Sequence, residues 1–477
     1  MSRKIGLVLG LFLFFYSLFS APPSNIGEQA WVTAGVGMLM AVWWATQVLP
    51  LPVTSLLPII LFPLLGLSSV REATVPYVHP VIFLLLGGFI IATALQRWQL
   101  HRRLALTILH LVGSQPHAIV GGFMIVSAFL SMWISNTATT IMMLPIAISL
   151  AQVMLEGQSK EAANKFTVCL MLGIAYAASI GGLGTLIGTP PNAMMAAFMS
   201  QTYGINIGFA QWMSFGLPVV FILVPIAWLL LTRLVFTFDL GHNATAAGVV
   251  DSELEALGPM TTPEKRTAIV FVFIALAWVT RPLLQQIPGL AALNDTIIAV
   301  AGAVSLFLIP SGEKRQKNTR LLDWSTAKGI PWGVLLLFGG GLSLAAMVSS
   351  SGLAAWLGTV LSVLTSFHVF TLMLSIVAMV VFLTELTSNT ATTATLLPVF
   401  GGIATAAYLE PMLLIAPMAL AASCAFMLPV ATAPNAIVFG SGKVSIPQMA
   451  GAGFCLNLVV ITLITPLAYL LIPLIFL

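Results

Sequence analysis

Long, mainly apolar runs without a charged residue limit the possible folds of this sequence more than any other feature. Two of them, Met213–Leu231 and Gly451–Leu477, are long enough to cross roughly 30 Å of hydrocarbon as helices. Only 7% of the 477 residues are charged, and the mean hydropathy is +1.05. By contrast, roughly a quarter of the residues of a soluble domain are charged. Since so little polar surface cannot cover a globular fold in water, the sequence predicts an all-α polytopic membrane protein.

About eleven transmembrane helices and two re-entrant hairpins account for the apolar segments. The hairpins are predicted near Ala118–Gln152 and Phe370–Ala407, because a polar patch interrupts each of these two apolar pieces. The spans are predicted at about Gly6–Phe19, Trp31–Val48, Leu51–Leu67, Val81–Leu95, Phe166–Ser200 (interrupted), Met213–Phe236, Thr267–Thr280, Ile297–Leu308, Pro331–Val348, Pro411–Phe439 (interrupted) and Gly451–Phe476.

The placement of Lys and Arg tests this topology. If Arg3 and Lys4 lie in the cytoplasm, then of the 18 basic residues only Arg71 and Arg281 fall on the outer side. Such an excess of positive charge on one side is typical of cytoplasmic loops, and a miscounted span would spoil it. We therefore expect a bacterial inner-membrane protein with a cytoplasmic N-terminus and a periplasmic C-terminus. The first apolar segment also has the layout of a signal peptide, but the many later spans favour an uncleaved helix.

Three short motifs occur twice in the same order. The pairs are Phe83–Gly88 with Leu335–Gly340, Ser135–Thr140 with Ser388–Thr393, and Thr189–Asn192 with Thr432–Asn435. Collinear matches at a nearly constant offset indicate an internal duplication. In the predicted topology the span before the first hairpin runs inward and its counterpart runs outward. The two halves are therefore predicted to be inverted repeats, a recurring architecture of secondary transporters.

Each half contains two polar patches that break a helix at membrane depth. One is the tripeptide Ser-Asn-Thr, and the other is a Gly/Pro-rich break at 181–192 or 429–435. Such patches must line a cavity or be buried in protein. Proline leaves backbone carbonyls free, and these carbonyls with Ser, Thr and Asn oxygens suit a hard cation such as sodium. Helix N-termini at the same breaks suit an anion. The pattern therefore predicts an ion-coupled anion site.

Each of these sequence features also has an ordinary structural explanation. A single Ser-Asn-Thr is a common helix N-cap, and a single Pro-Pro-Asn could be an ordinary kink; their duplication favours a site. Glu385 is the one carboxylate predicted well inside a membrane element, where it could couple protons or hold the second hairpin through a hydrogen bond. We favour the second role. Because the tips and breaks contain no Lys or Arg, anion recognition must come from dipoles, hydroxyls, amides and a bound cation.

Other classes of function lack their sequence signals. We find no nucleophile–base arrangement or His/Glu constellation at membrane depth, so an enzyme is not expected. An anion channel is less favoured, because no ring of charges is visible. Nothing suggests nucleic acid as a partner, and no cofactor is expected beyond sodium as a coupling ion.

On the doubled Ser-Asn-Thr and Thr-x-Pro-Asn motifs, the chain is similar to the divalent anion–sodium symporter family of di- and tricarboxylate carriers. The resemblance covers nearly the whole chain. It implies a homodimer, a scaffold and a transport domain in each protomer, and an elevator-type motion. The implied parts are N-terminal scaffold helices (1–80), the first inverted repeat (81–236), cytoplasmic loops with connecting scaffold helices (237–330) and the second inverted repeat (331–477).

The resemblance also implies roles for individual residues. The cation (sodium) ligands would be Ser131, Ser135, Asn136 and Gly188 in the first half, and Thr384, Ser388, Asn389 and Ala431 in the second. The carboxylate substrate would contact Asn136, Thr137, Thr189, Asn389, Thr390 and Thr432. A sodium-coupled symporter of succinate, malate, oxoglutarate or citrate is favoured over an exchanger of di- or tricarboxylates, which the family also contains. Ala433 replaces a proline of the first-half motif, so the geometry of the second break is harder to predict.

Overall fold

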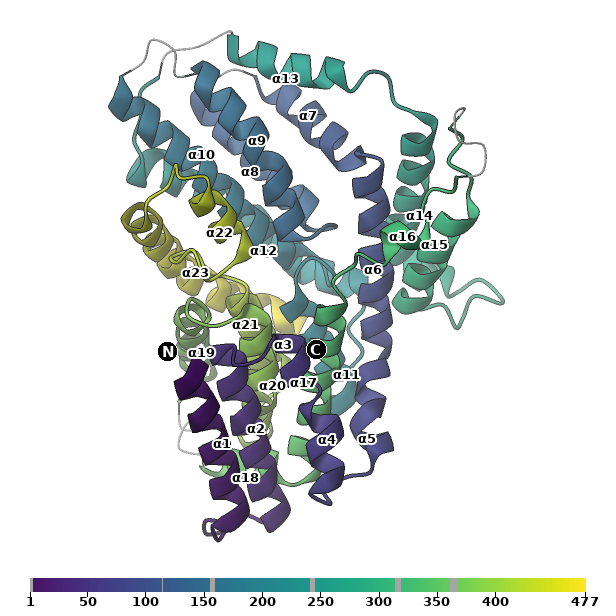
Figure 1. Ribbon diagram of the computed structural model, residues 1–477, viewed down its shortest axis with the longest axis vertical. Helices are drawn as coiled ribbons and strands as arrows, with labels where there is room; N and C mark the ends of the chain where they lie inside the picture. Colours follow the sequence, from purple (N-terminus) through teal and green to yellow (C-terminus); the bar gives the residue numbers. More distant parts are fainter. Residues whose placement is uncertain (1–2, 114, 155–158, 241–244, 314–318, 361–366) are drawn as a thin grey trace.

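The computed structural model describes residues 3–113, 115–154, 159–240, 245–313, 319–360 and 367–477 (Figure 1). Every regular element in these ranges is a helix, apart from one isolated β-bridge between Pro310 and Arg320. The predicted all-α class is therefore confirmed. Three basic residues assigned to the cytoplasmic side, Lys314, Arg315 and Lys317, lie outside the described residues.

Among the described residues, seven helical segments are long and apolar enough to cross a membrane. They are Val70–Arg97, Asn136–Met154, Lys160–Gly184, Phe209–Val235, Thr262–Leu284, Trp332–Ser350 and Ile446–Ile475. Shorter apolar helices occupy Leu51–Leu64, Pro116–Ser131, Asp295–Leu308, Val369–Thr384 and Met412–Ala422. The chain is thus a multi-pass membrane protein, and the eleven predicted spans draw on both groups and on the two N-terminal helices.

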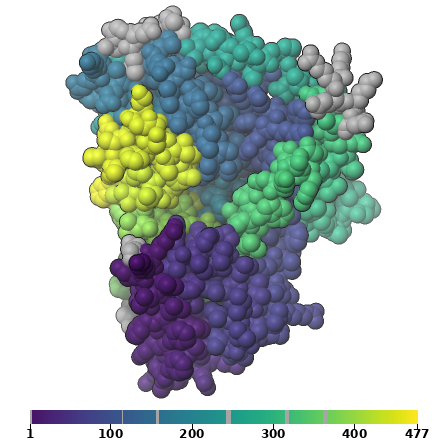
Figure 2. All heavy atoms as spheres, in the orientation of Figure 1, coloured from purple at the N-terminus to yellow at the C-terminus, as the bar shows by residue number. Residues whose placement is uncertain are grey.

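The N-terminal helices α1 (Arg3–Phe19) and α2 (Glu28–Thr46) pack side by side at one end of the molecule (Figure 1). Their close approach depends on small residues, since a Cβ at Gly35 of α2 would overlap the Ser17 side chain of α1. Figure 2 shows this pair at the lower end, with the C-terminal helix above it.

The span predicted at Leu51–Leu67 is in fact two short helices, α3 (Leu51–Thr54) and α4 (Leu57–Leu64). Pro58 explains the interruption, because it has no N–H and its ring blocks the carbonyl of Thr54. A helix that begins at Leu51 therefore ends at Thr54. The next elements are α5 (Val70–Thr74), the 3-10 turn η1 (Val75–Val78) and α6 (Pro80–Arg97).

Two series of helices follow the same order in the two halves. The first comprises α8 (Pro116–Ser131), α9 (Asn136–Met154), α10 (Lys160–Gly181), the 3-10 turn η2 (Gly182–Gly184) and α11 (Pro190–Tyr203). The second comprises α19 (Val369–Thr384), α20 (Asn389–Ala406), α21 (Met412–Ala422) and α22 (Ala433–Gly440). In each series a Ser-Asn-Thr begins the second helix, with its serine just before that helix, and a Gly/Pro break lies between the last two helices. The helices are interrupted where the sequence predicts.

The remaining helices connect and flank these series. They are α7 (Leu100–Val112), α12 (Phe209–Leu229) with the π-helical turn η3 (Leu230–Val235), α13 (Thr245–Ala256), α14 (Thr262–Leu284), α15 (Asp295–Leu308), α16 (Trp324–Ala327), α17 (Trp332–Ser350), α18 (Leu353–Val360) and α23 (Ile446–Ile475). Figure 1 shows α13 lying across the end of the molecule to which α7 and α9 also extend.

Ion pairs join α6 and α7 to the polar segments 239–266 and 311–328. Arg97 pairs with Asp323, Arg102 with Glu253, and Arg103 with Glu264 at 3.0 Å. Hydrogen bonds from the Ser325 hydroxyl and the Thr326 N–H, together with Arg97, hold the pKa of Asp323 well below its ordinary value. Both partners of each pair come from segments that the predicted topology assigns to the same side, so the pairs are consistent with that topology.

Candidate functional site

One cavity of about 790 Å³ collects residues from both Ser-Asn-Thr tips and both helix breaks. Of the site residues predicted from the sequence, the cavity is lined by Ser135, Asn136, Thr137, Gly188, Thr189, Ser388, Asn389, Thr390, Ala431 and Thr432. The two others, Ser131 and Thr384, lie directly behind the tips and are fully buried. Residues more than 250 positions apart in the sequence therefore meet at a single site.

Four helices begin at this cavity. They are α9 at Asn136, α11 at Pro190, α20 at Asn389 and α22 at Ala433. The first N–H groups of a helix have no partner within the helix, and the helix dipole places partial positive charge there. None of the described residues that line the cavity is Lys, Arg, Asp or Glu. The N-termini and the neighbouring hydroxyl and amide groups are therefore what an anion would meet; α11 contributes only its dipole, because Pro190 and Pro191 have no N–H.

Behind the first tip, three oxygen atoms converge. The Ser131 hydroxyl contacts Asn136 Oδ1 and lies 2.6 Å from the carbonyl oxygen of Ala178. A hydroxyl carries one proton, so it can donate to only one of these two acceptors at a time. A cluster of three oxygens that shares one proton is a good set of ligands for a hard cation.

The second tip repeats this arrangement. Thr384 Oγ1 lies 2.8 Å from Asn389 Oδ1 and 2.9 Å from the carbonyl oxygen of Ala422. The residue that supplies the hydroxyl lies five positions before the asparagine in both halves. Two equivalent oxygen clusters therefore lie at the bases of the two tips, where the resemblance implies the cation ligands.

The first break packs tightly against the first tip. A Cβ at Gly188 would lie 2.5 Å from the carbonyl oxygen of Gly182, and one at Gly182 would lie 3.1 Å from Asn136 Oδ1. The Gly182 carbonyl is a backbone atom that cannot yield as a flexible side chain can, so position 188 needs the missing side chain of glycine, and a Cβ at Gly182 would press against Asn136. This close approach brings the backbone of the break to Asn136.

Two asparagines hold the breaks in shape, a role that the sequence analysis missed. Asn192 Nδ2 donates to the carbonyl oxygens of Gly182, Leu183 and Thr185 at 3.1, 3.3 and 2.9 Å. Asn435 Nδ2 donates to those of Ala425 and Leu428 at 3.2 and 3.1 Å. Both belong to the Thr-x-Pro-Asn motif, so their duplication was the signal that could have found them.

Thr189 and Thr432 occupy matching positions but make different contacts. Thr432 Oγ1 accepts a hydrogen bond from the Asn435 N–H and so caps α22. Thr189 Oγ1 instead lies 3.2 Å from Ser423 Oγ, at the end of α21. This contact links the break of one half to the break of the other, and nothing in the local sequence around Ser423 predicts it.

Glu385 holds the second break rather than facing the cavity. Its buried carboxylate accepts hydrogen bonds from the backbone N–H groups of Phe426, Met427 and Leu428 and from the Asn457 side chain. Of the two roles considered for Glu385, this geometry favours holding the hairpin through hydrogen bonds.

The opposite wall of the cavity comes from α2, α6 and the segment before α17. It includes two side-chain amides, Gln47 and Gln96, which the sequence analysis did not select. Gln47 is exposed and has left-handed backbone angles, φ 49° and ψ 45°, which are uncommon for a residue other than glycine. These amides are available for a ligand that fills the cavity.

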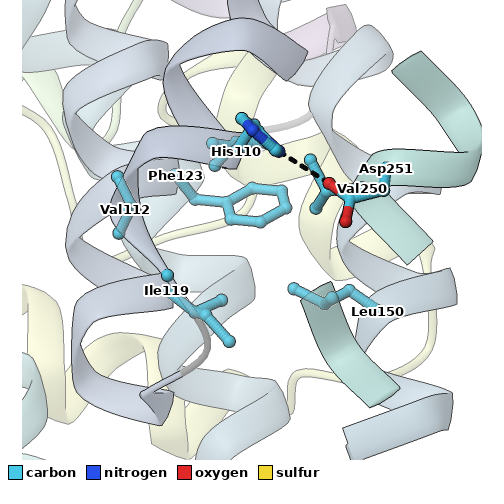
Figure 3. A pocket seen from close by; sticks show the side chains of 9 residues that line it. His110, Val112, Ile119, Phe123, Leu150, Val250 and Asp251 are labelled. Atoms are coloured by element: carbon cyan, nitrogen blue, oxygen red, sulfur yellow. Dashed lines mark hydrogen bonds and ion pairs between the residues drawn. The ribbon is translucent and has the colours of Figure 1, made fainter. Parts of the chain in front are cut away.

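A second, smaller cavity of about 90 Å³ lies between α7, α8, α9 and α13 (Figure 3). His110 and Asp251 pair across its rim at 2.6 Å, and the figure shows Phe123 and Leu150 among the mainly apolar side chains of its walls. None of the predicted site residues lines it. We therefore interpret it as a packing space beneath the His110–Asp251 hydrogen bond that joins α7 to α13.

Comparisons with known proteins show what this chain is similar to. Residues 2–477 match the family model described as the sodium:sulfate symporter transmembrane region. The chain is 42% identical to the sodium-dependent dicarboxylate transporter SdcS of Staphylococcus aureus strain USA300, over 99% of this chain and 92% of that protein. It is also 42% identical to the protein of the same name from Staphylococcus saprophyticus, with the same coverage.

Solved structures show the same fold at low sequence identity. The YdaH transporter of Alcanivorax borkumensis aligns with a TM-score of 0.59 at 13% identity, over 87% of this chain and 89% of that one. MtrF of Neisseria gonorrhoeae aligns with a TM-score of 0.60 at 12% identity, over 98% and 94%. Because the family model and the more similar relatives span almost the entire sequence, this chain belongs to the sodium:sulfate symporter family, the divalent anion–sodium symporters.

Proposed function

We propose that this protein is a sodium-coupled symporter of dicarboxylates. The observation that carries the proposal is the single uncharged cavity at which four helix N-termini and two equivalent tips meet. An anion finds N–H and O–H donors there, and cations find two oxygen clusters. The names of the relatives that are 42% identical support dicarboxylate as the substrate and sodium as the coupling ion.

The residues divide between the two ligands according to their chemistry. Each cation is coordinated at the base of a tip, by Ser131, Ser135, Asn136 and Gly188 or by Thr384, Ser388, Asn389 and Ala431. The two carboxylates of the substrate contact Asn136, Thr137 and Thr189 on one side and Asn389, Thr390 and Thr432 on the other. Bound cations supply the positive charge that the cavity walls lack. This dependence of anion binding on cation binding couples the two fluxes.

The site moves across the membrane in an elevator-type motion. The two series of helices, in 81–236 and 331–477, form inverted repeats that carry the cavity, while 1–80 and the helices of 237–330 form a scaffold within a homodimer. Gln96 and the segment 329–331 line the cavity next to residues assigned to the cytoplasmic side. In an inner membrane with the N-terminus in the cytoplasm, this conformation therefore faces inward.

Uptake into proteoliposomes tests the proposal. Purified protein is reconstituted, and uptake of labelled succinate, malate, oxoglutarate and citrate is measured with and without an inward sodium gradient. We expect sodium-driven accumulation of the dicarboxylates, and potassium in place of sodium should abolish it.

The same assay separates the alternatives. Uptake that ignores sodium but requires dicarboxylate inside the vesicle would identify an exchanger and refute symport. Uptake that never exceeds the external concentration under a sodium gradient would indicate a channel. Loss of transport in both Asn136→Ala and Asn389→Ala supports the site, whereas full transport in both variants contradicts it.

A further inference from the structure

Glu385 makes an unusually complete set of contacts for a buried carboxylate. It follows the last residue of α19 and is 3% exposed. Oε1 accepts from Phe426 N at 2.7 Å, Met427 N at 3.0 Å and Asn457 Nδ2 at 2.8 Å. Oε2 accepts from Met427 N and Leu428 N, both at 3.1 Å. Glu385 is the acceptor in every one of these hydrogen bonds, as expected of a carboxylate that carries no proton to donate.

These contacts connect three parts of the second half. Glu385 lies three residues before Ser388 of the tip. The three backbone N–H groups belong to the break between α21 and α22, and Asn457 belongs to α23. From Leu428 the chain continues directly to Ala431, whose N–H donates to the Leu428 carbonyl oxygen at 3.2 Å. The side chain of Glu385 therefore fixes the position of the break relative to the tip.

The first half uses a different device at the same place. Met132 occupies the position three residues before Ser135. There, side-chain donors bind backbone carbonyls instead of a carboxylate accepting from backbone N–H groups. Trp212 Nε1 donates to Leu183 O at 3.0 Å, and Thr185 Oγ1 donates to Met132 O at 2.6 Å. The duplicated motif thus conceals an asymmetry, because only the second tip is joined to its break by a carboxylate.

We propose that Glu385 is a positioning residue for the second cation site, an inference that rests on the proposed sodium-coupled function. It does not touch the cation or the substrate. Its charge-assisted hydrogen bonds hold three consecutive N–H groups and so set where Ala431 lies relative to Asn389. Without the carboxylate the buried N–H of Phe426 and the half-buried N–H groups of Met427 and Leu428 would lose their acceptor, and the break would rearrange to find one. The affinity for sodium at this site therefore depends on Glu385.

Two substitutions test different parts of this role. Glu385→Gln keeps the shape but turns one oxygen into an NH₂ group, which must face a backbone N–H as donor against donor. Glu385→Asp keeps the charge but shortens the side chain by one methylene. For both variants we expect the sodium concentration at half-maximal uptake to rise roughly tenfold, which corresponds to the loss of about one charge-assisted hydrogen bond. Half-saturation by succinate, measured at saturating sodium, should change much less.

Asp295→Asn is the matched control. Asp295 is also a buried carboxylate that accepts a backbone N–H, that of Phe209 at 2.7 Å, but it pairs with Arg281 and does not line the cavity. The control therefore makes the same chemical change elsewhere, and its sodium dependence should stay within about twofold of the parent. The melting temperature of each purified variant reports any general loss of stability separately.

A gentler variant keeps the test decisive if the Glu385 variants do not reach the membrane. Asn457→Ala removes one donor to Glu385 and leaves the three backbone contacts in place, so sodium half-saturation should rise by about two- to threefold. If the parent protein shows no sodium dependence, the proposed function fails. If the parent depends on sodium while Glu385→Gln, or Asn457→Ala in its place, keeps the parental half-saturation, the positioning role of Glu385 is wrong.

Discussion

The two oxygen clusters behind the tips lead to the same prediction for both halves of the protein: loss of the hydroxyl should weaken sodium binding. Ser131→Ala and the nearly isosteric Thr384→Val each remove one hydroxyl from a cluster of three oxygens. In the parent these hydroxyls lie 2.6 Å from Ala178 O and 2.9 Å from Ala422 O, and each also contacts the neighbouring asparagine oxygen. The variants therefore lose a proposed cation ligand without changing the shape of the cavity.

The size of the effect follows from the environment of these hydroxyls. Both residues are fully buried, so water cannot replace the missing oxygen. Loss of one partner by a buried polar group costs roughly 1–3 kcal/mol. A difference of that size corresponds to a change in affinity of about 5- to 150-fold. We expect sodium half-saturation of succinate uptake to rise within this range in each variant.

The chain offers matched controls in α9 and α20, one turn after Asn136 and Asn389. Thr140 and Thr393 are buried hydroxyls that donate to the backbone carbonyls of Asn136 and Asn389, each at 2.8 Å. Thr140→Val and Thr393→Val remove the same chemical group from the helix interior, and their sodium half-saturation should stay within about twofold of the parent. The assay is initial uptake by proteoliposomes over a range of sodium concentrations. Sodium half-saturation that is unchanged in both Ser131→Ala and Thr384→Val would refute the oxygen-cluster argument.

Three further predictions concern the breaks and the ion pairs. Gly188→Ala places a Cβ 2.5 Å from the Gly182 carbonyl oxygen, an overlap that costs roughly 1–3 kcal/mol; uptake should fall at least tenfold, and parental uptake would show that the break is looser than described. Asn192→Leu removes a donor to three buried carbonyls; Leu183 O keeps the Trp212 Nε1 donor, and each of the other two that is left unsatisfied costs roughly 1–3 kcal/mol, so a lower melting temperature is expected. Asp323 has a pKa below its ordinary value near 3.8, so it stabilises the folded state above that pH and loses the contribution as pH falls. The gap in melting temperature between the parent and Asp323→Asn should therefore be constant above about pH 5 and shrink below about pH 4; a gap that widens in acid would contradict the sign.

Much of this site could be predicted because its signals are local. A polar tripeptide or a Gly/Pro run inside an apolar segment interrupts a helix wherever it occurs, since lipid offers the exposed backbone no partners. Its exact repetition at 135–140 and 388–393 identified the two tips as a pair. The helix ends at Ser131, Gly181, Thr384 and Ala422 agree with these positions. The spans near proline-rich stretches were less predictable, as the division of Leu51–Leu67 shows.

What the sequence by itself determined was the membrane class, the helix interruptions and the residues of the tips, because spacing along one chain is enough to place them. Only the tertiary structure decided how the halves meet: Thr189 beside Ser423, Glu385 beneath the amides of 426–428, and the glutamines of the opposite wall. These contacts join residues that lie tens to hundreds of positions apart. They depend on the packing of whole helices, which local patterns of side chains do not predict.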